Sequence, residues 1–457
     1  MTDFRQRAHD LVDQLADHLE AATRGEGLAI PYRAPNEAYA FWQSFKGTEE
    51  ELYGAVLQQS TAVHHPGYVG HQVAVPSTSA ILARWVSDVL NNGSAVYEMG
   101  MAALAIERRV TEELCTGLGM PATAGGIMTS GGSLANLTAM LSARQVQAPD
   151  RPGESLCVLV SDQAHYCIDR AVRIMGWGAE GLVPVRTDRA TFQVLPQGLQ
   201  EALDEAERRG RRPVAVVGMA CSTSTGTYDD LQLLAAFAKT HGLWFHVDAA
   251  HGGAAGFSES EKHLVRGMEL ADSITLDAHK MMRTPALTTA LLYRKHEDSY
   301  RTFAQRADYL WAEDEAQWYH GGQRTVECTK LMMGLTLFAV LQEEGLTGIG
   351  NYVERQHALA RSFAERVDKR AHWELAVPPM SNIVCFRHNP AYLTDPGAVD
   401  AHNLALRERL LHDGRYYVVS TRLHNVLWLR VTLMNPNTTI QHLEELLHLA
   451  EEMVHLH

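Results

Sequence analysis

Short apolar runs alternate with helix-like segments between about residue 76 and residue 295, and this alternation limits the possible folds more than any other feature. Segments with helical spacing of apolar residues, Leu134–Val146, Leu199–Arg209 and Leu231–Thr240, lie between several of the runs. The runs themselves, typical of buried strands, are Cys157–Val160, Val214–Met219, Trp244–Val247, Ser273–Leu276 and Thr288–Tyr293. The pattern predicts an α/β fold with a mostly parallel central sheet and helices on both faces.

The sequence outside the alternating region predicts two further parts. Residues 1–75 are expected to form an N-terminal helical and extended segment, 76–325 a large domain, and 326–457 a smaller C-terminal α+β domain. The polar stretch 300–324 is expected to be a loop that can move, and a long helical segment is expected around 326–370. Strands are predicted at Asn382–Phe386, Tyr417–Ser420 and Leu427–Leu433, and a last helix at 438–453.

Composition excludes several kinds of partner. The 457 residues carry a formal net charge of −14, which argues against binding to nucleic acid or to anionic membranes. No signal peptide and no apolar run near 20 residues is found, so a cytoplasmic, soluble protein is expected. The six cysteines are scattered and form no CxxC pair, which favours reduced thiols.

Two short segments that each begin with an aspartate directly follow apolar runs and carry the strongest chemical signal. One run leads into Asp277-Ala-His279-Lys280, and another into Asp248-Ala-Ala250-His-Gly-Gly. Active-site groups of parallel sheets gather at the carboxyl ends of strands. A lysine there can act as a nucleophilic amine, and an aspartate followed by small residues can pair with a protonated ring nitrogen. The two segments predict that Lys280 carries pyridoxal phosphate as a Schiff base and that Asp248 holds its pyridine nitrogen.

Alternatives to this interpretation are open at both segments. Lys280 taken alone is also compatible with a solvated loop lysine, and Asp248 with a strand-end aspartate whose hydrogen bonds are satisfied. A zinc site built from His246, Asp248 and His251 is a third possibility, but no HExxH or CxxC motif supports it. No metal is therefore expected.

Three weaker motifs fit the same cofactor. The turn Thr129-Ser-Gly-Gly132-Ser133 leads into a helix, where free amides and a hydroxyl can bind a phosphate. His165 follows the run at 157–160 and is placed to stack on a flat ring, and Thr223 belongs to a cluster of hydroxyl residues after the run at 214–219. An ordinary helix cap, a structural histidine and a simple turn are the alternatives.

The order and wording of these motifs resemble the group II pyridoxal-phosphate-dependent decarboxylases of fold type I. That family includes aromatic-amino-acid, glutamate, sulfinoalanine and diaminobutyrate decarboxylases. The matching strings are TSGGSLANL, SDQAHYC, HVDAAHGG and ADSITLDAHK, with weaker similarity at HPGYVGH and VLWLRVTLMNPNTT. The resemblance covers nearly the whole chain, and the pair formed by DAHK and HVDAA is specific.

The resemblance implies a set of residue roles and a homodimer whose active sites lie at the interface. Lys280 binds the cofactor, Asp248 pairs with its ring nitrogen and His165 stacks on the ring. The remaining cofactor contacts implied are Ala250 on the opposite ring face, Gly132, Ser133 and Asp277 or His279 near the phosphate, and Thr223 near the ring substituents. Asp277 departs from the pattern, since several relatives have asparagine there and a carboxylate does not itself hold a phosphate dianion.

The implied reaction is decarboxylation of an L-amino acid to the amine and CO2, through an internal aldimine with Lys280 and a quinonoid intermediate. Tyr309 or Tyr319, or else His165, is the expected proton donor, and His65, Tyr68, His71 and Tyr97 are candidate substrate-binding residues. The same cofactor set is compatible with an oxidative deaminase or aldehyde synthase, an aminotransferase or a carbon–carbon lyase. A catalytically silent protein on this fold is the alternative from a different class.

Overall fold

A computed structural model describes residues 2–149, 155–303 and 317–455. The chain forms two compact units, one of residues 76–355 and one that combines residues 1–75 with 356–457. The domain boundary expected after residue 325 lies inside the larger unit, and the three-part division of the chain stays a prediction. Among the described residues, no helix has the length and apolar character needed to cross a membrane.

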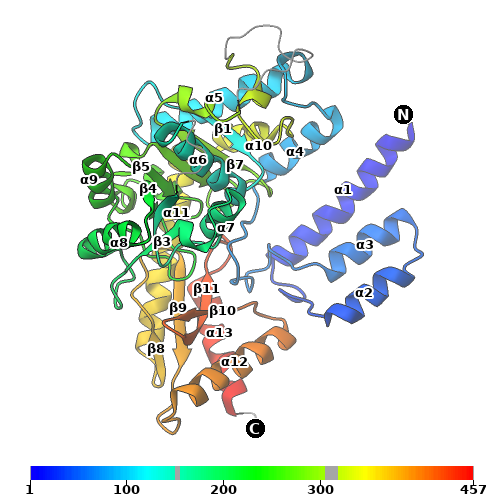
Figure 1. Ribbon diagram of the computed structural model, residues 1–457. Helices are drawn as coiled ribbons and strands as arrows, with labels where there is room; N and C mark the ends of the chain where they lie inside the picture. Colours follow the sequence, from blue (N-terminus) through cyan, green and yellow to red (C-terminus); the bar gives the residue numbers. More distant parts are fainter. Residues whose placement is uncertain (1, 150–154, 304–316, 456–457) are drawn as a thin grey trace. The chain divides into compact units, whose positions relative to one another are not determined.

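The larger unit is built on a seven-stranded sheet with the strand order β1-β7-β6-β5-β4-β2-β3 (Figure 1). The β7 strand runs antiparallel to both of its neighbours, and the other pairs are parallel. The strands are β1 (Gly125–Thr129), β2 (Leu156–Ser161), β3 (Leu182–Val185), β4 (Arg212–Met219), β5 (Trp244–Asp248), β6 (Ser273–Asp277) and β7 (Thr289–Tyr293). The α/β class and the five strands expected in this region are confirmed.

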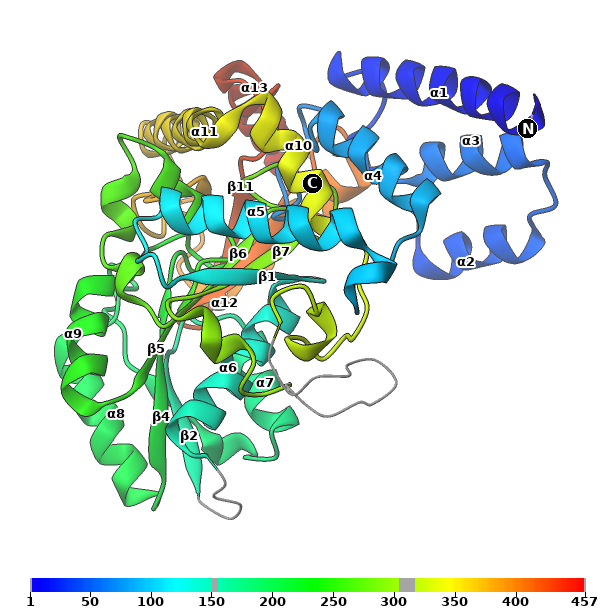
Figure 2. The ribbon, with the colours of Figure 1, turned by 90° about the horizontal axis from the view of Figure 1, so that it is seen from above.

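Helices cover both faces of this sheet. Figure 2 shows α5 and α6 on opposite sides of β1, and α8 and α9 contact the strands β2 to β5. The helices are α4 (Thr78–Leu90), α5 (Met101–Gly117), α6 (Gly132–Gln147), α7 (Cys167–Ile174), α8 (Pro196–Arg208), α9 (Leu231–His241) and α10 (Met333–Glu343). Every residue of β1, β2, β5, β6 and β7 is buried, which explains why these strands are so rich in apolar residues.

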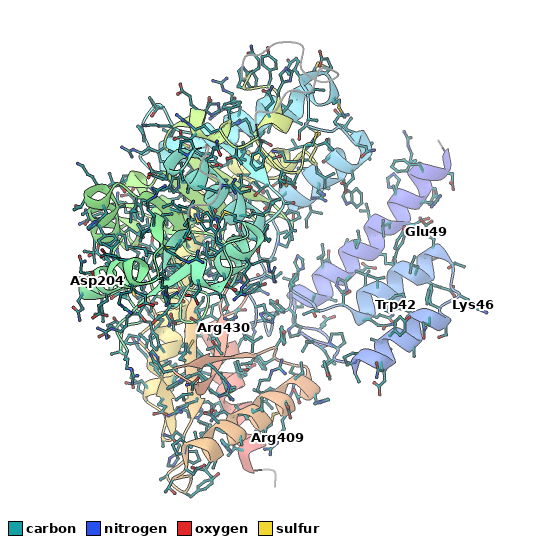
Figure 3. The ribbon with its side chains drawn as sticks, in the orientation of Figure 1. Trp42, Lys46, Glu49, Asp204, Arg409 and Arg430 are labelled. Atoms are coloured by element: carbon teal, nitrogen blue, oxygen red, sulfur yellow. The ribbon has the colours of Figure 1, made fainter. Side chains whose placement is uncertain are left out.

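The smaller unit contains a four-stranded antiparallel sheet with the order β10-β11-β9-β8. Its core includes Phe363, Trp373 and Phe386, packed with leucines of the last helix. At the N-terminus, Glu49 begins α3 and pairs with Arg7 of α1; Glu49 is labelled in Figure 3. The elements are α1 (Thr2–Thr23), α2 (Pro35–Ser44), α3 (Glu49–Gln59), β8 (Trp373–Leu375), β9 (Ile383–His388), α12 (Pro396–Asp413), β10 (Val419–Leu423), β11 (Val426–Thr432) and α13 (Ile440–His455).

The long helical segment predicted around 326–370 differs from the structure. Helix begins only at Met333, and two helices follow, α10 and α11 (Gly345–Asp368). Gly345 has a φ of +63°, a left-handed conformation that ends the first helix. Residues 326–332 form turns and irregular chain, with Cys328 at a φ of +60°, and the buried Lys330 of this stretch bonds to the sheet edge. The expected loop at 300–324 falls largely outside the described residues.

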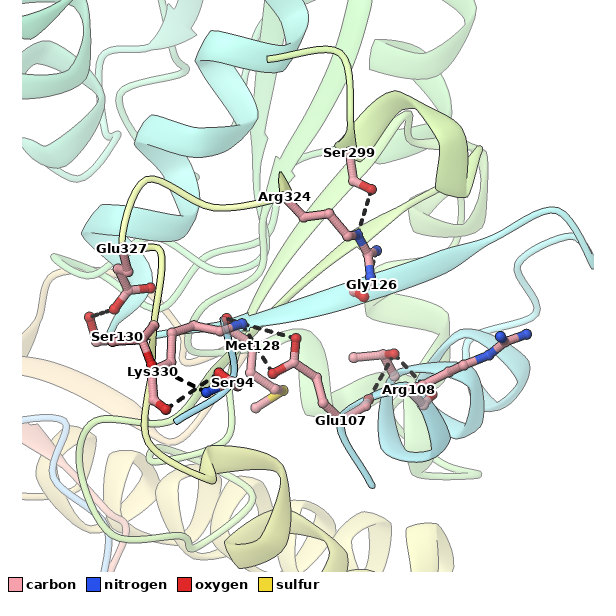
Figure 4. A network of polar contacts seen from close by, with 12 residues as sticks. Ser94, Glu107, Arg108, Gly126, Met128, Ser130, Ser299, Arg324, Glu327 and Lys330 are labelled. Carbon is pink, nitrogen blue, oxygen red and sulfur yellow. Dashed lines mark hydrogen bonds and ion pairs between the residues drawn. The ribbon is translucent and has the colours of Figure 1, made fainter. Parts of the chain in front are cut away.

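Two buried cations close the free edge of the central sheet (Figure 4). Arg324 donates to the carbonyl of Gly126 at 2.9 Å, and Lys330 donates to that of Met128 at 2.7 Å. These carbonyls belong to β1, an edge strand whose outward-facing groups have no strand partner. Lys330 also binds both carboxylate oxygens of Glu107, at 2.9 and 3.1 Å. The two cations therefore hold the segment before α10 against the sheet.

Replacement of Lys330 by methionine is expected to destabilise the protein by about 3–5 kcal/mol, because it leaves Glu107 charged and buried without a partner. Urea denaturation measures the effect. The double variant Lys330→Met with Glu107→Leu is the control, since it removes both charges and should recover most of the loss. A loss below about 1 kcal/mol for the single variant would contradict this account of the edge.

Candidate active site

Polar side chains gather where β5 and β6 end. Asp248 is the last residue of β5 and Asp277 the last of β6, and Lys280 follows three residues later. The strands are parallel neighbours, with His246 paired to Ser273 and Asp248 to Thr275. Because side chains alternate along a strand, His246, Asp248, Ser273, Thr275 and Asp277 all point to the face that α6 covers. One strand-end region therefore brings the predicted lysine and both acids together.

Lys280 is held by the carboxylate of Asp277. Its Nζ lies 3.1 Å from Asp277 Oδ2. Burial lowers the pKa of Lys280, but the charges of Asp277 and Asp248 raise it by more, so its net pKa is above the ordinary lysine value. The amine is consequently a cation at neutral pH and has to lose a proton before it can act as a nucleophile.

Asp277 has further partners that fix its position. Thr289 Oγ1 donates to Asp277 Oδ1 at 2.5 Å from the adjacent strand β7. A Cβ atom added to Gly132 would meet both carboxylate oxygens at 3.0 Å, so a larger residue there would press on Asp277. His279 Nε2 lies 3.7 Å from Oδ2. These contacts explain the acid at this position, because Asp277 orients Lys280; a direct contact with a phosphate stays a prediction.

Replacement of Asp277 by asparagine is expected to speed covalent attachment of pyridoxal phosphate to Lys280 at neutral pH. The variant removes a charge that raises the pKa of Lys280, so a larger fraction of the amine is neutral at a given pH. Stopped-flow absorbance should show a severalfold faster reaction whose pH dependence moves toward lower pH. Asp298→Asn, at a buried aspartate paired with Arg301, is the control. An unchanged pH dependence would contradict the role of Asp277.

Asp248 is a buried carboxylate with no cation in direct contact. Its Oδ2 accepts from Asn136 Nδ2 at 2.8 Å and its Oδ1 from the backbone amide of Ala250 at 3.2 Å. Burial raises the pKa of Asp248, and the more distant charge of Lys280 opposes this increase. Among the residues that the structure describes, none forms an ion pair with Asp248. A protonated ring nitrogen would supply the missing charge.

His165 is a neutral ring at neutral pH. Burial lowers its pKa to about 4, and the charge of Lys280 acts in the same direction. Its Nδ1 accepts from the amide of Cys167 at 3.3 Å. A neutral imidazole suits stacking on an aromatic ring, whereas donation of a proton to carbon would need the imidazolium form. Of the three proton donors expected from the sequence, the pKa disfavours His165.

The loop that carries Thr223 lies next to the loop that carries His165. Ser222 Oγ donates to the carbonyl of Gln163 at 3.3 Å, and Ser224 Oγ donates to Gln163 Oε1 at 3.2 Å. Thr223, between these serines, is partly exposed. Gln163, two residues before His165, therefore joins the hydroxyl cluster to the loop of the predicted stacking residue.

The turn before α6 is suited to an anion. Gly131 has a φ of +105°, and no side chain caps the helix there, so the first amides of α6 are available. Ser133 is exposed in the first turn, and Gly132 lies next to Asp277. Together with the uncompensated Asp248, the amine of Lys280 and the neutral ring of His165, this turn fits pyridoxal phosphate. A zinc site does not fit, because both ring nitrogens of His246 are hydrogen-bonded to protein groups.

Comparisons with known proteins agree with this geometry. The model of the pyridoxal-dependent decarboxylase conserved domain matches residues 32–389. The chain belongs to this family. L-2,4-diaminobutyrate decarboxylase of Rhizobium meliloti is 31% identical over 85% of this chain and 78% of its own length. Aromatic-L-amino-acid decarboxylase of Bacillus atrophaeus is 27% identical over 87% of this chain and 84% of its own length. The crystal structure of mouse CSAD in apo form has the same fold, with a TM-score of 0.91, 23% identity and 99% coverage of both chains. As a pyridoxal-dependent decarboxylase, the protein has pyridoxal phosphate as its cofactor and is a carboxy-lyase.

The predicted substrate residues of this decarboxylase fall in different units. His65, Tyr68 and His71 belong to the smaller unit, where Tyr68 and His71 pack against Tyr417. Burial lowers the pKa of His65 and of His71, which favours neutral rings over anion-binding cations.

Two predicted tyrosines of the larger unit lie together. The ring centroids of Tyr97 and Tyr319 are 5.7 Å apart in an edge-to-face arrangement. A predicted substrate residue therefore contacts a predicted proton donor. The other candidate donor, Tyr309, lies outside the described residues.

Several residues of the decarboxylase site escaped the sequence analysis. Asn136 bonds to Asp248 directly, Ser273 and Trp244 are linked to Asn136 through His246, and Thr289 holds Asp277. The period-two spacing of Trp244, His246 and Asp248 would have placed the three on one face of the sheet. Nothing in the sequence indicates that β7, which brings Thr289, returns antiparallel beside β6.

Proposed function

We propose that the protein decarboxylates an L-amino acid to the corresponding amine and CO2, with pyridoxal phosphate attached to Lys280. The observation that carries the proposal is the buried carboxylate of Asp248, which has no cationic partner among the described residues and lies within electrostatic reach of the partly buried amine of Lys280. Relatives named as decarboxylases of diaminobutyrate and of aromatic amino acids support this reaction class. The site therefore combines an acid for a ring nitrogen with an amine for an aldehyde.

Each residue has a distinct task in this proposal. When bound, the cofactor accepts the electron pair left by the departing carboxylate. Asp248 would keep the ring nitrogen charged, and Lys280 would hold the cofactor until the substrate amine displaces it. Asp277 orients Lys280 and stabilises its positive charge. His165 covers one ring face, and Tyr309 or Tyr319 protonates the substrate carbon. Exclusion of water from the site favours this protonation over side reactions.

Incubation of the cofactor-loaded protein with a panel of L-amino acids tests the proposal. CO2, amine, aldehyde and ammonia are measured in parallel. The account predicts CO2 and amine in equal amounts from at least one amino acid, without aldehyde. Aldehyde with ammonia would indicate oxidative deamination instead. A reaction that needs a second substrate to accept the amino group would indicate transamination. Absence of CO2 from every amino acid would contradict the proposal.

A homodimer is part of the same proposal. Leu82, Val86 and Val89 form an apolar stripe on α4 and are 55%, 51% and 71% exposed. A hollow of about 630 Å³ next to α4 is lined by apolar residues, such as Met99, and by polar ones, which include Arg84 of α4 and Ser130 of the predicted phosphate turn. A second copy that covers the stripe would also cover this turn.

Analytical ultracentrifugation tests the homodimer. The parent is expected to sediment with twice the chain mass of 50.6 kDa, and Val86→Glu with Val89→Glu should sediment as monomers. A monomeric parent would contradict the proposal.

A further inference from the structure

A line of four hydrogen-bonded side chains lies behind Asp248. Trp244 Nε1 is 2.8 Å from Ser273 Oγ, which is 2.8 Å from His246 Nδ1. His246 Nε2 is 2.9 Å from Asn136 Oδ1, and Asn136 Nδ2 is 2.8 Å from Asp248 Oδ2. We refer to Trp244, Ser273, His246 and Asn136 as the relay. The relay runs from the interior of the sheet to the carboxylate that faces the cofactor.

When Asp248 is charged, only one arrangement of the hydrogens gives every hydrogen bond of the relay a donor and an acceptor. A carboxylate only accepts, so Asn136 presents its NH₂ group to Asp248 and its carbonyl oxygen to His246. His246 Nε2 must then carry the hydrogen. Burial lowers the pKa of His246 to about 3, so the ring is neutral and its Nδ1 accepts from the hydroxyl of Ser273. The indole of Trp244 can only donate, and it donates to the Ser273 oxygen.

The fold keeps this line free of water. No member of the relay is more than 2% exposed, and Asp248 itself is 4% exposed. Trp244, His246 and Asp248 alternate along β5, Ser273 is paired with His246 on β6, and Asn136 lies in the second turn of α6. The thiol of Cys167, also 3.1 Å from Asn136 Nδ2, is neutral because burial raises its pKa to about 12. Its sulfur lies 4.0 Å from Asp248 Oδ2, so among the described residues Asn136 is the one that donates a short side-chain hydrogen bond to this carboxylate.

We propose that the relay acts as a positioning device that fixes Asp248 in its charged form and at the orientation needed to keep the cofactor ring nitrogen protonated. The inference rests on the proposed function, and it adds Asn136 and His246 as positioning residues that act through Asp248. A donor with a fixed orientation stabilises the carboxylate without the reorganisation that water would need. Reversal of the relay would turn the Asn136 carbonyl toward Asp248 and favour the protonated acid, which cannot hold a charged ring nitrogen.

Nitrogen NMR of the loaded protein tests the relay directly. The protein is reconstituted with pyridoxal phosphate labelled with ¹⁵N in the ring, and the chemical shift of that nitrogen reports its protonation. The parent should show a protonated nitrogen. Asn136→Ala should lower the protonated fraction and weaken cofactor binding roughly tenfold, because one hydrogen bond to a charged group is lost. Ser273→Ala, which touches neither Asp248 nor Asn136, should change the shift in the same direction by less.

Two further variants separate positioning from simple stability. Ser142→Ala removes a hydrogen bond between the same helix and Tyr293, outside the relay, and should leave the nitrogen shift unchanged. Asn136→Asp with Asp248→Asn exchanges acceptor and donor, so it should restore thermal stability relative to Asn136→Asp alone but not the protonated nitrogen.

The outcomes distinguish the relay from the proposed function. A parent-like shift in both Asn136→Ala and Ser273→Ala would overturn the relay while the proposed function stands. A parent whose ring nitrogen is unprotonated would overturn the role of Asp248 itself, and with it the relay.

Discussion

Replacement of Lys280 by alanine is expected to lower the rate of decarboxylation by about 10³-fold or more, which corresponds to at least about 4 kcal/mol of activation free energy. The amine that would bind the cofactor and later release the product is then absent. The variant should also lack the visible absorbance of the bound cofactor at about 420 nm. Initial rates of CO2 release, measured with saturating pyridoxal phosphate, give the effect on the chemical step.

Lys280→Arg separates the charge of this residue from its chemistry. Arginine keeps a cation next to Asp277 and so preserves the ion pair that the structure shows at 3.1 Å. It cannot attach the cofactor covalently, because its guanidinium stays protonated. The account predicts that arginine is as inactive as alanine. Lys262→Ala, at an exposed lysine paired with Glu259, is the control with parental activity. Activity of either Lys280 variant within tenfold of the parent would contradict the role of this residue.

Replacement of Asp248 by asparagine is expected to lower activity by about 30- to 5,000-fold, because removal of one partner from a buried charge pair costs about 2–5 kcal/mol. The side chain keeps its shape and still accepts from Asn136, but it no longer balances a charged ring nitrogen. The loss should appear mainly in kcat, and cofactor affinity should fall as well. Asp229→Asn is the matched control, since Asp229 is a buried acid held by the amides of Met219 and Val194.

The same variant has the opposite effect on the cofactor-free protein. The pKa of Asp248 in the folded state is raised above 3.8, so the folded state binds this proton more tightly than the unfolded chain does. The contribution of this group to stability is therefore lost as the pH rises from 3.8 through the raised pKa, and the buried charge is a cost at neutral pH. Asp248→Asn removes that cost, and thermal denaturation at neutral pH should show a cofactor-free variant at least as stable as the parent. A variant clearly less stable than the parent would contradict the conclusion that the charge of Asp248 is uncompensated in the cofactor-free protein.

The sequence predicted the parts of the fold that depend on buried strands. Runs such as Trp244–Val247 and Ser273–Leu276 are apolar because β5 and β6 are covered on both faces, and their ends therefore marked the site. The strand β1 was not predicted, because its two glycines and a threonine do not form an apolar run. It is held in the sheet by pairing with β7 and by hydrogen bonds from Arg324 and Lys330. The helical prediction at 326–332 was wrong, since helix begins only at Met333 and the buried Lys330 of this stretch bonds to β1.

Site residues could be predicted where a chemically reactive side chain lies at the end of a strand. They could not be predicted where contacts between distant parts of the chain bring the residue to the site. Lys280 and Asp248 could be recognised because Asp248 ends β5 and Lys280 lies three residues beyond the end of β6. The partners of Asp277 and the relay could not, because Thr289 and Asn136 reach the site from a returning strand and from a helix more than a hundred residues earlier in the chain. Spacing along one segment carries no information about such contacts. The residues that bind the substrate side chain stay predictions.

Borohydride reduction of the protein loaded with pyridoxal phosphate identifies the residue that carries the cofactor. Reduction makes the carbon–nitrogen link to a lysine permanent, and mass spectrometry of the digested protein identifies the labelled residue. The account predicts one labelled peptide, spanning residues 273–283, with the modification on Lys280 and strongly reduced labelling in Asp248→Asn. A label on another lysine, or no label at all, would contradict it.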